Sequence, residues 1–180
     1  MMKNIFSFNF LGMPVTFTLS AFIGSDVLIV LIIIVALLLT ELSLPTAILA
    51  ACIAVLIHWL CEIIHMYGHF IAAKQTGYPS RGVNLWGVIG TILYPRDEPE
   101  LAPNIHIRRA LGGPIANAIV LVICIILAVL FWSNAGLPRF LLGFAIFSNI
   151  VFSVGALTPI SIGSIEIDGG TIMRWMRKKQ

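Results

Sequence analysis

The stretch "HWLCEIIHMYGHF" (residues 58–70) places three histidines and a glutamate in an otherwise largely apolar part of the chain. In an α-helix, which turns about 100° per residue, His58, Glu62, His65 and His69 fall within about 60° of one another. An ionised carboxylate at the middle of a membrane-spanning helix costs at least about 3 kcal/mol unless it is paired. We therefore expect this face of the helix to point toward the protein interior, a cavity or a metal ion.

The composition of the whole chain is that of a membrane protein. Its 180 residues are 59% hydrophobic and 11% charged, with a mean hydropathy of +1.01, well outside the range of soluble domains. The net charge of +3 gives no indication of binding to nucleic acid. The three cysteines lie in apolar runs without paired spacing, so we interpret them as packing residues. We expect no cleavable signal peptide.

The apolar runs predict a single domain, residues 1–180, with the fold class of an all-α polytopic membrane protein. About four runs approach or exceed the roughly 20 residues that span a bilayer as a helix. Small membrane-associated β elements are predicted at residues 5–19 and 82–94, and a proline-rich surface loop at residues 95–106. A last ordered segment is expected from Ile165 to Trp175. The predicted spanning helices are residues 21–40, 46–73, 110–132 and 140–157.

The positive charges predict how the helices cross the membrane, because cytoplasmic loops carry an excess of Lys and Arg. With four spans and a cytoplasmic N-terminus, ten of the eleven Lys and Arg residues lie on the cytoplasmic side, and Arg139 alone lies outside. We therefore expect a multi-pass protein of the cell membrane, embedded in the lipid bilayer, with both termini in the cytoplasm.

The spacing of His65 and His69 is typical of a metal site, because histidines at positions i and i+4 can offer ring nitrogens to one ion. The alternative is a polar packing seam, in which the histidines bind neighbouring backbone or hydroxyl groups. Glu62 and His58 share this face, so the seam would include them as well.

A zinc site with an open coordination position needs a third protein ligand. Asp168, in "IEIDGG" (165–170), is the leading candidate, because the two glycines beside it allow the backbone to bend sharply and approach closely. The alternative is an N-cap for a helix that starts near Gly170. Glu166 is a weaker candidate, and we expect His106 to be a solvated loop residue.

Three stretches, in order along the chain, resemble motifs of the site-2 protease family of intramembrane zinc metalloproteases. "HMYGHFIAA" (65–73) resembles the family's H-E-x-x-H helix, and "LGGPIANAIV" (111–120) resembles its Gly-Pro-x-x-Asn segment. "LTPISIGSIEIDGG" (157–170) resembles the proline-rich stretch that ends in Asp-Gly. "LGMPVTFT" (11–18) is similar to the strand before the family's first span, so the resemblance covers nearly the whole chain.

The resemblance implies that His65, His69 and Asp168 hold Zn²⁺, and that Asn117 lines the site or assists the transition state. It further implies that residues 82–94 bind an extended substrate by strand addition; the alternative is a plug that packs the cytoplasmic mouth. The implied substrate is a transmembrane or membrane-proximal protein.

The clearest departure from the family pattern is Met66, which stands where the family has the glutamate that moves protons during hydrolysis. A thioether cannot do this, and loss of a general base typically lowers a rate about 10²- to 10⁴-fold. Glu62 lies about 4.5 Å further toward the helix N-terminus, so we interpret it as a partner of a histidine N–H or, alternatively, as a substitute base. The spacing from Pro159 to Asp168 is also longer than usual, and Asn149 lies nearly three turns before that proline.

Two functions follow from these patterns. In the first, the protein has a membrane-embedded zinc metallopeptidase fold that cleaves transmembrane substrates by metal-activated water, with activity impaired by Met66. In the second, it is a catalytically inactive pseudoprotease that binds membrane helices or an active partner. A small transporter or channel is a weaker interpretation, because the polar residues cluster around one site instead of lining a path.

Overall fold

The computed structural model describes residues 3–131, 135–162 and 165–178. Within them, four helices are long and apolar enough to cross a membrane. The predicted fold class, a polytopic helical membrane protein with small β elements, is confirmed. The predictions made for residues 132–134, 163–164 and 179 concern positions outside the described residues. The four long helices are α1 (Leu19–Leu39), α2 (Leu44–Gln75), α3 (Pro103–Phe131) and α4 (Leu137–Ser153).

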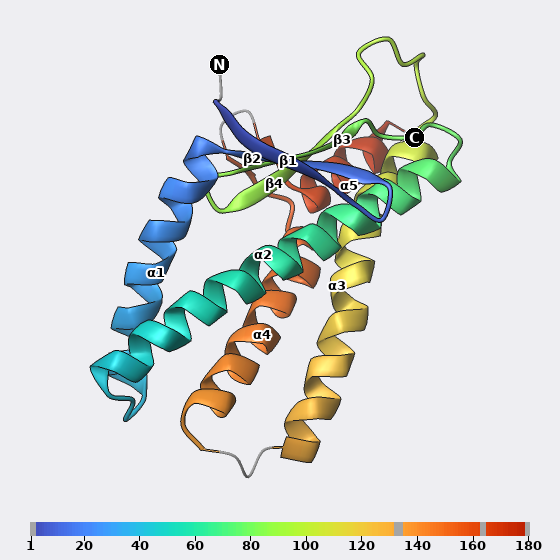
Figure 1. Ribbon diagram of the computed structural model, residues 1–180. Helices are drawn as coiled ribbons and strands as arrows, with labels where there is room; N and C mark the ends of the chain where they lie inside the picture. The colour runs from blue at the N-terminus through green and yellow to red at the C-terminus, as the bar shows by residue number, and fades with distance from the viewer. Residues whose placement is uncertain (1–2, 132–134, 163–164, 179–180) are drawn as a thin grey trace.

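Helix α2 is the longest element and carries the polar stretch that was expected to form the site. Its 32 residues correspond to about 48 Å, more than the roughly 30 Å of a bilayer core, and it runs obliquely across the other helices (Figure 1). The helix begins after Ser43 with a proline in its first turn. It ends before Gly77, whose φ of +82° stops the helix without steric strain.

Helix α3 differs from its prediction at the N-terminal end. The helix begins at Pro103, whereas a polar loop was predicted as far as residue 106. Proline is well tolerated in the first turn of a helix, because the N–H that it lacks would be unpaired there. The proline therefore starts this helix, and the charged residues that follow it occupy the first turns.

A four-stranded sheet lies at one end of the helices, the same end as the C-terminal helix (Figure 1). The strand order is β1-β2-β3-β4, with an antiparallel, a parallel and an antiparallel pairing in turn. The sheet confirms the predicted β elements near the N-terminus and at 82–94. The strands are β1 (Asn4–Phe10), β2 (Met13–Thr18), β3 (Gly82–Trp86) and β4 (Ile89–Leu93).

Close packing of α2 on α3 depends on two glycines. A Cβ atom added to Gly68 would clash with the carbonyl of Gly112 and would lie 2.8 Å from the Cβ of Ala116. A Cβ added to Gly112 would in turn lie 2.8 Å from the Cβ of Ala72. Small residues at such a crossing let two membrane helices approach with backbone contact. The crossing brings the histidine-bearing turns of α2 against the N-terminal half of α3.

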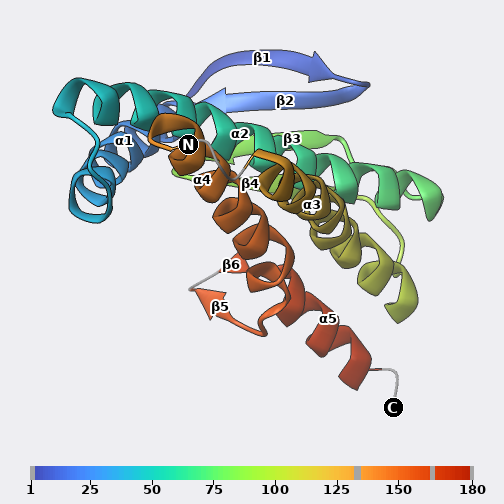
Figure 2. The ribbon, with the colours of Figure 1, turned by 90° about the horizontal axis from the view of Figure 1, so that it is seen from below.

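The chain after α4 lies on the side of the helices away from β1 and β2 (Figure 2). A short 3₁₀ turn, η1 (Gly155–Leu157), ends the fourth span. The strands β5 (Ser161–Ile162) and β6 (Ile165–Glu166) then pair with each other. Helix α5 (Asp168–Arg177) follows and packs on α3. The segment predicted from Ile165 to Trp175 therefore consists of the two-residue strand β6 followed by helix α5.

Candidate metal centre

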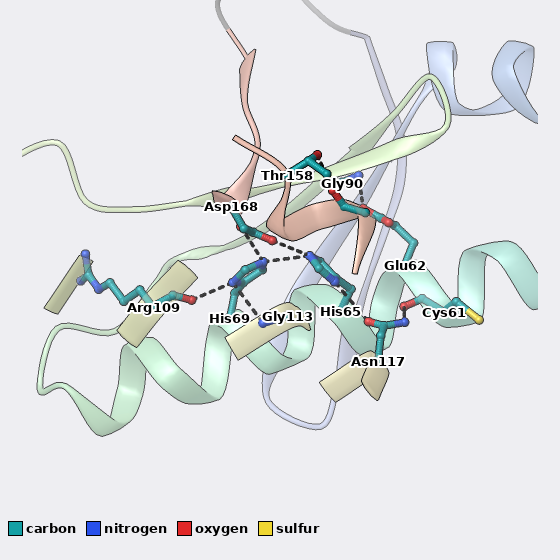
Figure 3. Close-up of polar contacts among 11 residues, drawn as sticks. Cys61, Glu62, His65, His69, Gly90, Arg109, Gly113, Asn117, Thr158 and Asp168 are labelled. Atoms are coloured by element: carbon teal, nitrogen blue, oxygen red, sulfur yellow. Dashed lines mark hydrogen bonds and ion pairs between the residues drawn. The ribbon is translucent and has the colours of Figure 1, made fainter. Parts of the chain in front are cut away.

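Three side chains from α2 and α5 converge on one point (Figure 3). The Nε2 atoms of His65 and His69 lie 3.0 Å apart. The two carboxylate oxygens of Asp168 lie 3.1 Å from His65 Nε2 and 3.3 Å from His69 Nε2. One potential ligand atom from each residue falls within a group no wider than 4.8 Å. The structure thus brings together the three residues that were predicted to bind a metal ion.

The orientation of the His69 ring is held by α3. Its Nδ1 lies 2.8 Å from the backbone carbonyl oxygen of Arg109. Because a carbonyl oxygen can only accept a hydrogen bond, Nδ1 must carry the proton. The backbone N–H of Gly113 lies 3.3 Å from the same nitrogen and could donate to it only in the other tautomer, so the shorter contact with Arg109 decides the assignment. The neutral ring therefore presents an unprotonated Nε2 to the centre.

Hydrogen-bonded side-chain amides of Asn117 and Asn149 hold the orientation of the His65 ring. Its Nδ1 lies 3.1 Å from Oδ1 of Asn117, which is fully buried in α3. The Nδ2 of Asn117 donates to the carbonyl of Cys61 at 3.2 Å and to Oδ1 of Asn149 at 2.9 Å. Since Nδ2 is committed as a donor, Oδ1 is the acceptor for the His65 Nδ1–H. In the neutral ring, Nε2 of His65 is then the nitrogen that faces the centre, as in His69.

This arrangement fits a cation at the centre. The Nε2 atoms of two imidazoles and a carboxylate face one another at hydrogen-bond distance, so a positive charge is needed among them, carried by a bound ion or by a proton on an imidazole. Burial raises the pKa of Asp168, but the neighbouring His69 and His65 outweigh this effect and hold it at about 2. Two imidazoles and one carboxylate are a ligand set that suits zinc and leaves one position open. The outer ring nitrogens are bonded to Arg109 and Asn117, as is usual for metal-binding histidines.

Asp168 reaches the centre because the next residue is glycine. A Cβ on Gly169 would clash with the backbone carbonyls of Leu157 and Thr158, so only glycine lets α5 approach the end of α4 this closely. The N-cap of α5 is Ile167, and Asp168 is the first residue of the helix. The N-cap interpretation of Asp168 is therefore wrong. Its side chain keeps 19% of its surface exposed, against 5% for each imidazole, so the centre opens toward α5.

Comparison with models of protein families finds no match, and comparison with curated proteins also finds none. A search of solved structures finds Site-2 Protease from Methanocaldococcus jannaschii, with a TM-score of 0.63 and 17% sequence identity. The match covers 98% of this chain and 73% of that chain. This chain has a site-2-protease-like fold. At this level of identity the match is evidence for the fold alone.

Within this site-2-protease-like fold, Met66 and Glu62 face the sheet. The exposed fraction of Met66 is 7%, and the side chain packs in the apolar cluster with Val83 and Leu85 of β3. Glu62 is 2% exposed, and its Oε1 accepts a hydrogen bond from the backbone N–H of Gly90 in β4. Among the described residues, no hydrogen bond joins Glu62 to either imidazole. Its carboxylate points toward Gly90 (Figure 3).

The other polar residues considered in the sequence lie outside the centre. His58 Nε2 lies 2.8 Å from the carbonyl of Val88 at the tip of the β3–β4 hairpin. Glu166 forms an ion pair with Arg174 at 2.8 Å. His106 was expected to be a solvated loop residue, which is wrong: it lies in α3 and stacks on Trp175 with 3.9 Å between ring centres.

Two of the residues that build the centre were not predicted from the sequence. Asn149 was not counted among the site residues because of its spacing from Pro159. The structure shows that its side chain is fully buried and hydrogen-bonded to Asn117. A polar amide inside an apolar span is itself a signal, because such groups are costly in a membrane unless bonded. Arg109 acts through its backbone carbonyl, which leaves no signal in a sequence.

Proposed function

We propose that the protein is an intramembrane zinc protein of the site-2-protease type, which binds a membrane-spanning protein substrate and hydrolyses it slowly because of Met66. His65, His69 and Asp168 would hold the zinc ion. When bound, zinc would act as a Lewis acid toward a peptide carbonyl and would lower the pKa of a bound water. The observation that carries the proposal is the convergence of three potential ligand atoms, with both outer ring nitrogens already bonded.

The residues around the centre would prepare it in three ways. Arg109 and Asn117 would keep both rings in the tautomer that presents Nε2. Burial of both imidazoles would exclude bulk water from one side, while the more exposed Asp168 leaves the other side open. The fully buried Asn117 would also line the site near a bound peptide.

A transmembrane or membrane-proximal protein segment is the proposed substrate. The centre lies on a helix that spans the membrane, at the end that carries the sheet (Figure 1). Among the described residues, β4 is an edge strand, and an edge strand can accept an extended segment by strand addition. Glu62 already binds the N–H of Gly90, so the added strand would pair with the part of β4 beyond that residue.

We further propose that the protein is a multi-pass protein of the cell membrane with both termini in the cytoplasm. The positive charges of the sequence support this orientation. In agreement with it, β1 and α5 lie at the same end of the four long helices (Figure 1).

A second candidate function is a pseudoprotease that binds membrane helices, or an active relative, without hydrolysis. The specific observation in its favour is that Met66 offers no base and that the nearby Glu62 carboxylate is bonded to Gly90. In this case zinc would have a structural role.

The proposal is tested by purifying the protein in detergent, measuring its zinc content and incubating it with a synthetic membrane-spanning peptide. We expect about one zinc ion per chain, loss of zinc in His65→Ala, and slow cleavage that a zinc chelator abolishes. A folded protein that binds no zinc would overturn the proposal. Zinc binding with no cleavage, even at high enzyme concentration, would favour the pseudoprotease.

A further inference from the structure

A buried ion pair lies beside the metal centre. Arg109 is 3% exposed, and its guanidinium donates to the two carboxylate oxygens of Glu98 at 2.5 and 3.1 Å. The same group donates to the backbone carbonyl of Tyr78 at 2.5 Å. It also lies 4.2 Å from the centre of the Tyr94 ring. One side chain thus connects the end of α2, the end of the β3–β4 hairpin and the segment that leads into α3.

Arg109 also contacts the metal centre, through its main chain. Its carbonyl oxygen accepts the hydrogen bond from Nδ1 of His69, at 2.8 Å. The same residue therefore carries the ion pair at one end and sets the ring orientation of a proposed zinc ligand at the other. A change in the position of the guanidinium can reach His69 through a single residue.

The helix is one hydrogen bond short immediately next to this carbonyl. Pro114 lies inside α3, and a proline within a helix removes one hydrogen bond and crowds the carbonyl four residues earlier, which here belongs to Ala110. The neighbouring N–H of Gly113, the regular helical donor to Arg109, lies 3.3 Å from the His69 ring as well. The turn from Arg109 to Pro114 therefore has one helical hydrogen bond fewer than a regular turn, which gives contacts from outside the helix more weight in positioning it.

We propose that Glu98 is a positioning residue for His69, acting through Arg109. The inference rests on the proposed function, because it treats the centre as a zinc site. The two parallel bonds between a guanidinium and a carboxylate restrict both groups in angle as well as distance. Without the carboxylate, the buried cation of Arg109 has to find solvent or a new partner. That shift moves the carbonyl that orients His69, so the zinc site loosens although no ligand has changed.

The test measures zinc affinity by competition with a chelator, together with the visible absorption spectrum of the cobalt-substituted protein. We expect Glu98→Gln to weaken zinc binding by about 3- to 10-fold, less than the 10- to 100-fold typical of groups bonded directly to a ligand. The cobalt spectrum should change in shape, since it reports the ligand geometry. The matched control is Glu100→Gln, which makes the same charge change at an exposed position of the same segment and should alter the affinity less than twofold.

A double variant separates positioning from a general effect on folding. In Glu98→Gln/Arg109→Gln no unpaired buried cation remains, so the unfolding temperature of the metal-free protein should recover toward that of the wild type. Zinc affinity should stay low, because no guanidinium–carboxylate pair then restrains residue 109 and its carbonyl. Recovery of zinc affinity in the double variant, or an unchanged affinity in Glu98→Gln, would overturn the inference while leaving the zinc site in place. A wild-type protein that binds no zinc would instead contradict the proposed function.

Discussion

The carboxylate of Glu62 accepts a hydrogen bond from the backbone N–H of Gly90, and so joins the middle of the histidine-bearing helix to the edge strand β4. A Cβ on Gly90 would lie 2.8 Å from both Glu62 Oε1 and Met66 Cγ. The side chains of Glu62 and Met66 thus both lie against Gly90 of the β3–β4 hairpin. This contact assigns Glu62 to the attachment of the sheet.

The first prediction concerns this attachment. Replacing Glu62 by leucine removes the acceptor of a partly buried N–H, which costs up to about 1–3 kcal/mol in the free energy of unfolding. We expect faster amide hydrogen exchange at Gly90 and a lower unfolding temperature, with zinc affinity almost unchanged. Glu62→Gln, which retains an acceptor oxygen, is the matched control and should lose much less protection. Unchanged exchange at Gly90 in the leucine variant would refute the assignment.

The second prediction concerns Met66. Because Met66→Glu places a carboxylate next to the first histidine, we expect at least about 10-fold faster cleavage of a membrane-spanning peptide. Met66→Gln has nearly the same shape as the glutamate variant but no base, and it should remain as slow as the wild type. Peptide cleavage is followed by mass spectrometry. Rapid wild-type cleavage that Glu62→Gln abolishes would show instead that Glu62 serves as the base.

The third prediction concerns the space beside the imidazoles. A Cβ on Gly113 would clash with the rings of both His65 and His69. We therefore expect Gly113→Ala to weaken zinc binding by about 10-fold or more, a loss at least as large as that from removing a group bonded to a ligand. Gly143→Ala is the control, because a Cβ at Gly143 in α4 meets nothing within 4 Å. Equal zinc affinities of the two variants, measured by competition, would argue against the site.

The fourth prediction ranks how strongly the side-chain amides of Asn117 and Asn149, behind His65, affect zinc affinity. Asn117→Ala removes the acceptor for its Nδ1–H, and we expect zinc affinity to fall by about 10- to 100-fold. Asn149→Ala removes one of the two acceptors of the Asn117 amide, so its effect should be smaller in the same direction. Asn104→Ala, at an exposed position in the first turn of α3, is the control. A larger loss in Asn149→Ala than in Asn117→Ala would contradict this order.

The fifth prediction concerns removal of the metal. A ligand that binds only the folded state stabilises it, by about 2.7 kcal/mol at a free concentration one hundred times its Kd. We expect a zinc chelator to lower the unfolding temperature of the wild type, and added zinc to restore it. The variant His65→Ala/His69→Ala should respond to neither treatment. An equal response of the variant would mean that zinc binds elsewhere.

The helical part of the fold could be predicted because each spanning helix depends on its own residues. Apolar runs of sufficient length predicted α1 and α2 to within two residues at each end, since a bilayer forces the backbone to satisfy its own hydrogen bonds. The early start of α3 at Pro103 was missed. Polar side chains dominate its first turns, and hydropathy does not reveal a helix that extends beyond the membrane.

The sequence by itself determined the membrane-spanning helices and the shared face of His65 and His69, because both follow from distances along a single helix. Only the tertiary structure decided that Asp168 meets those imidazoles and that Glu62 binds Gly90 instead. These contacts join residues far apart in the chain. They depend on close backbone approaches at Gly68 and Gly169, whose partners no local pattern specifies.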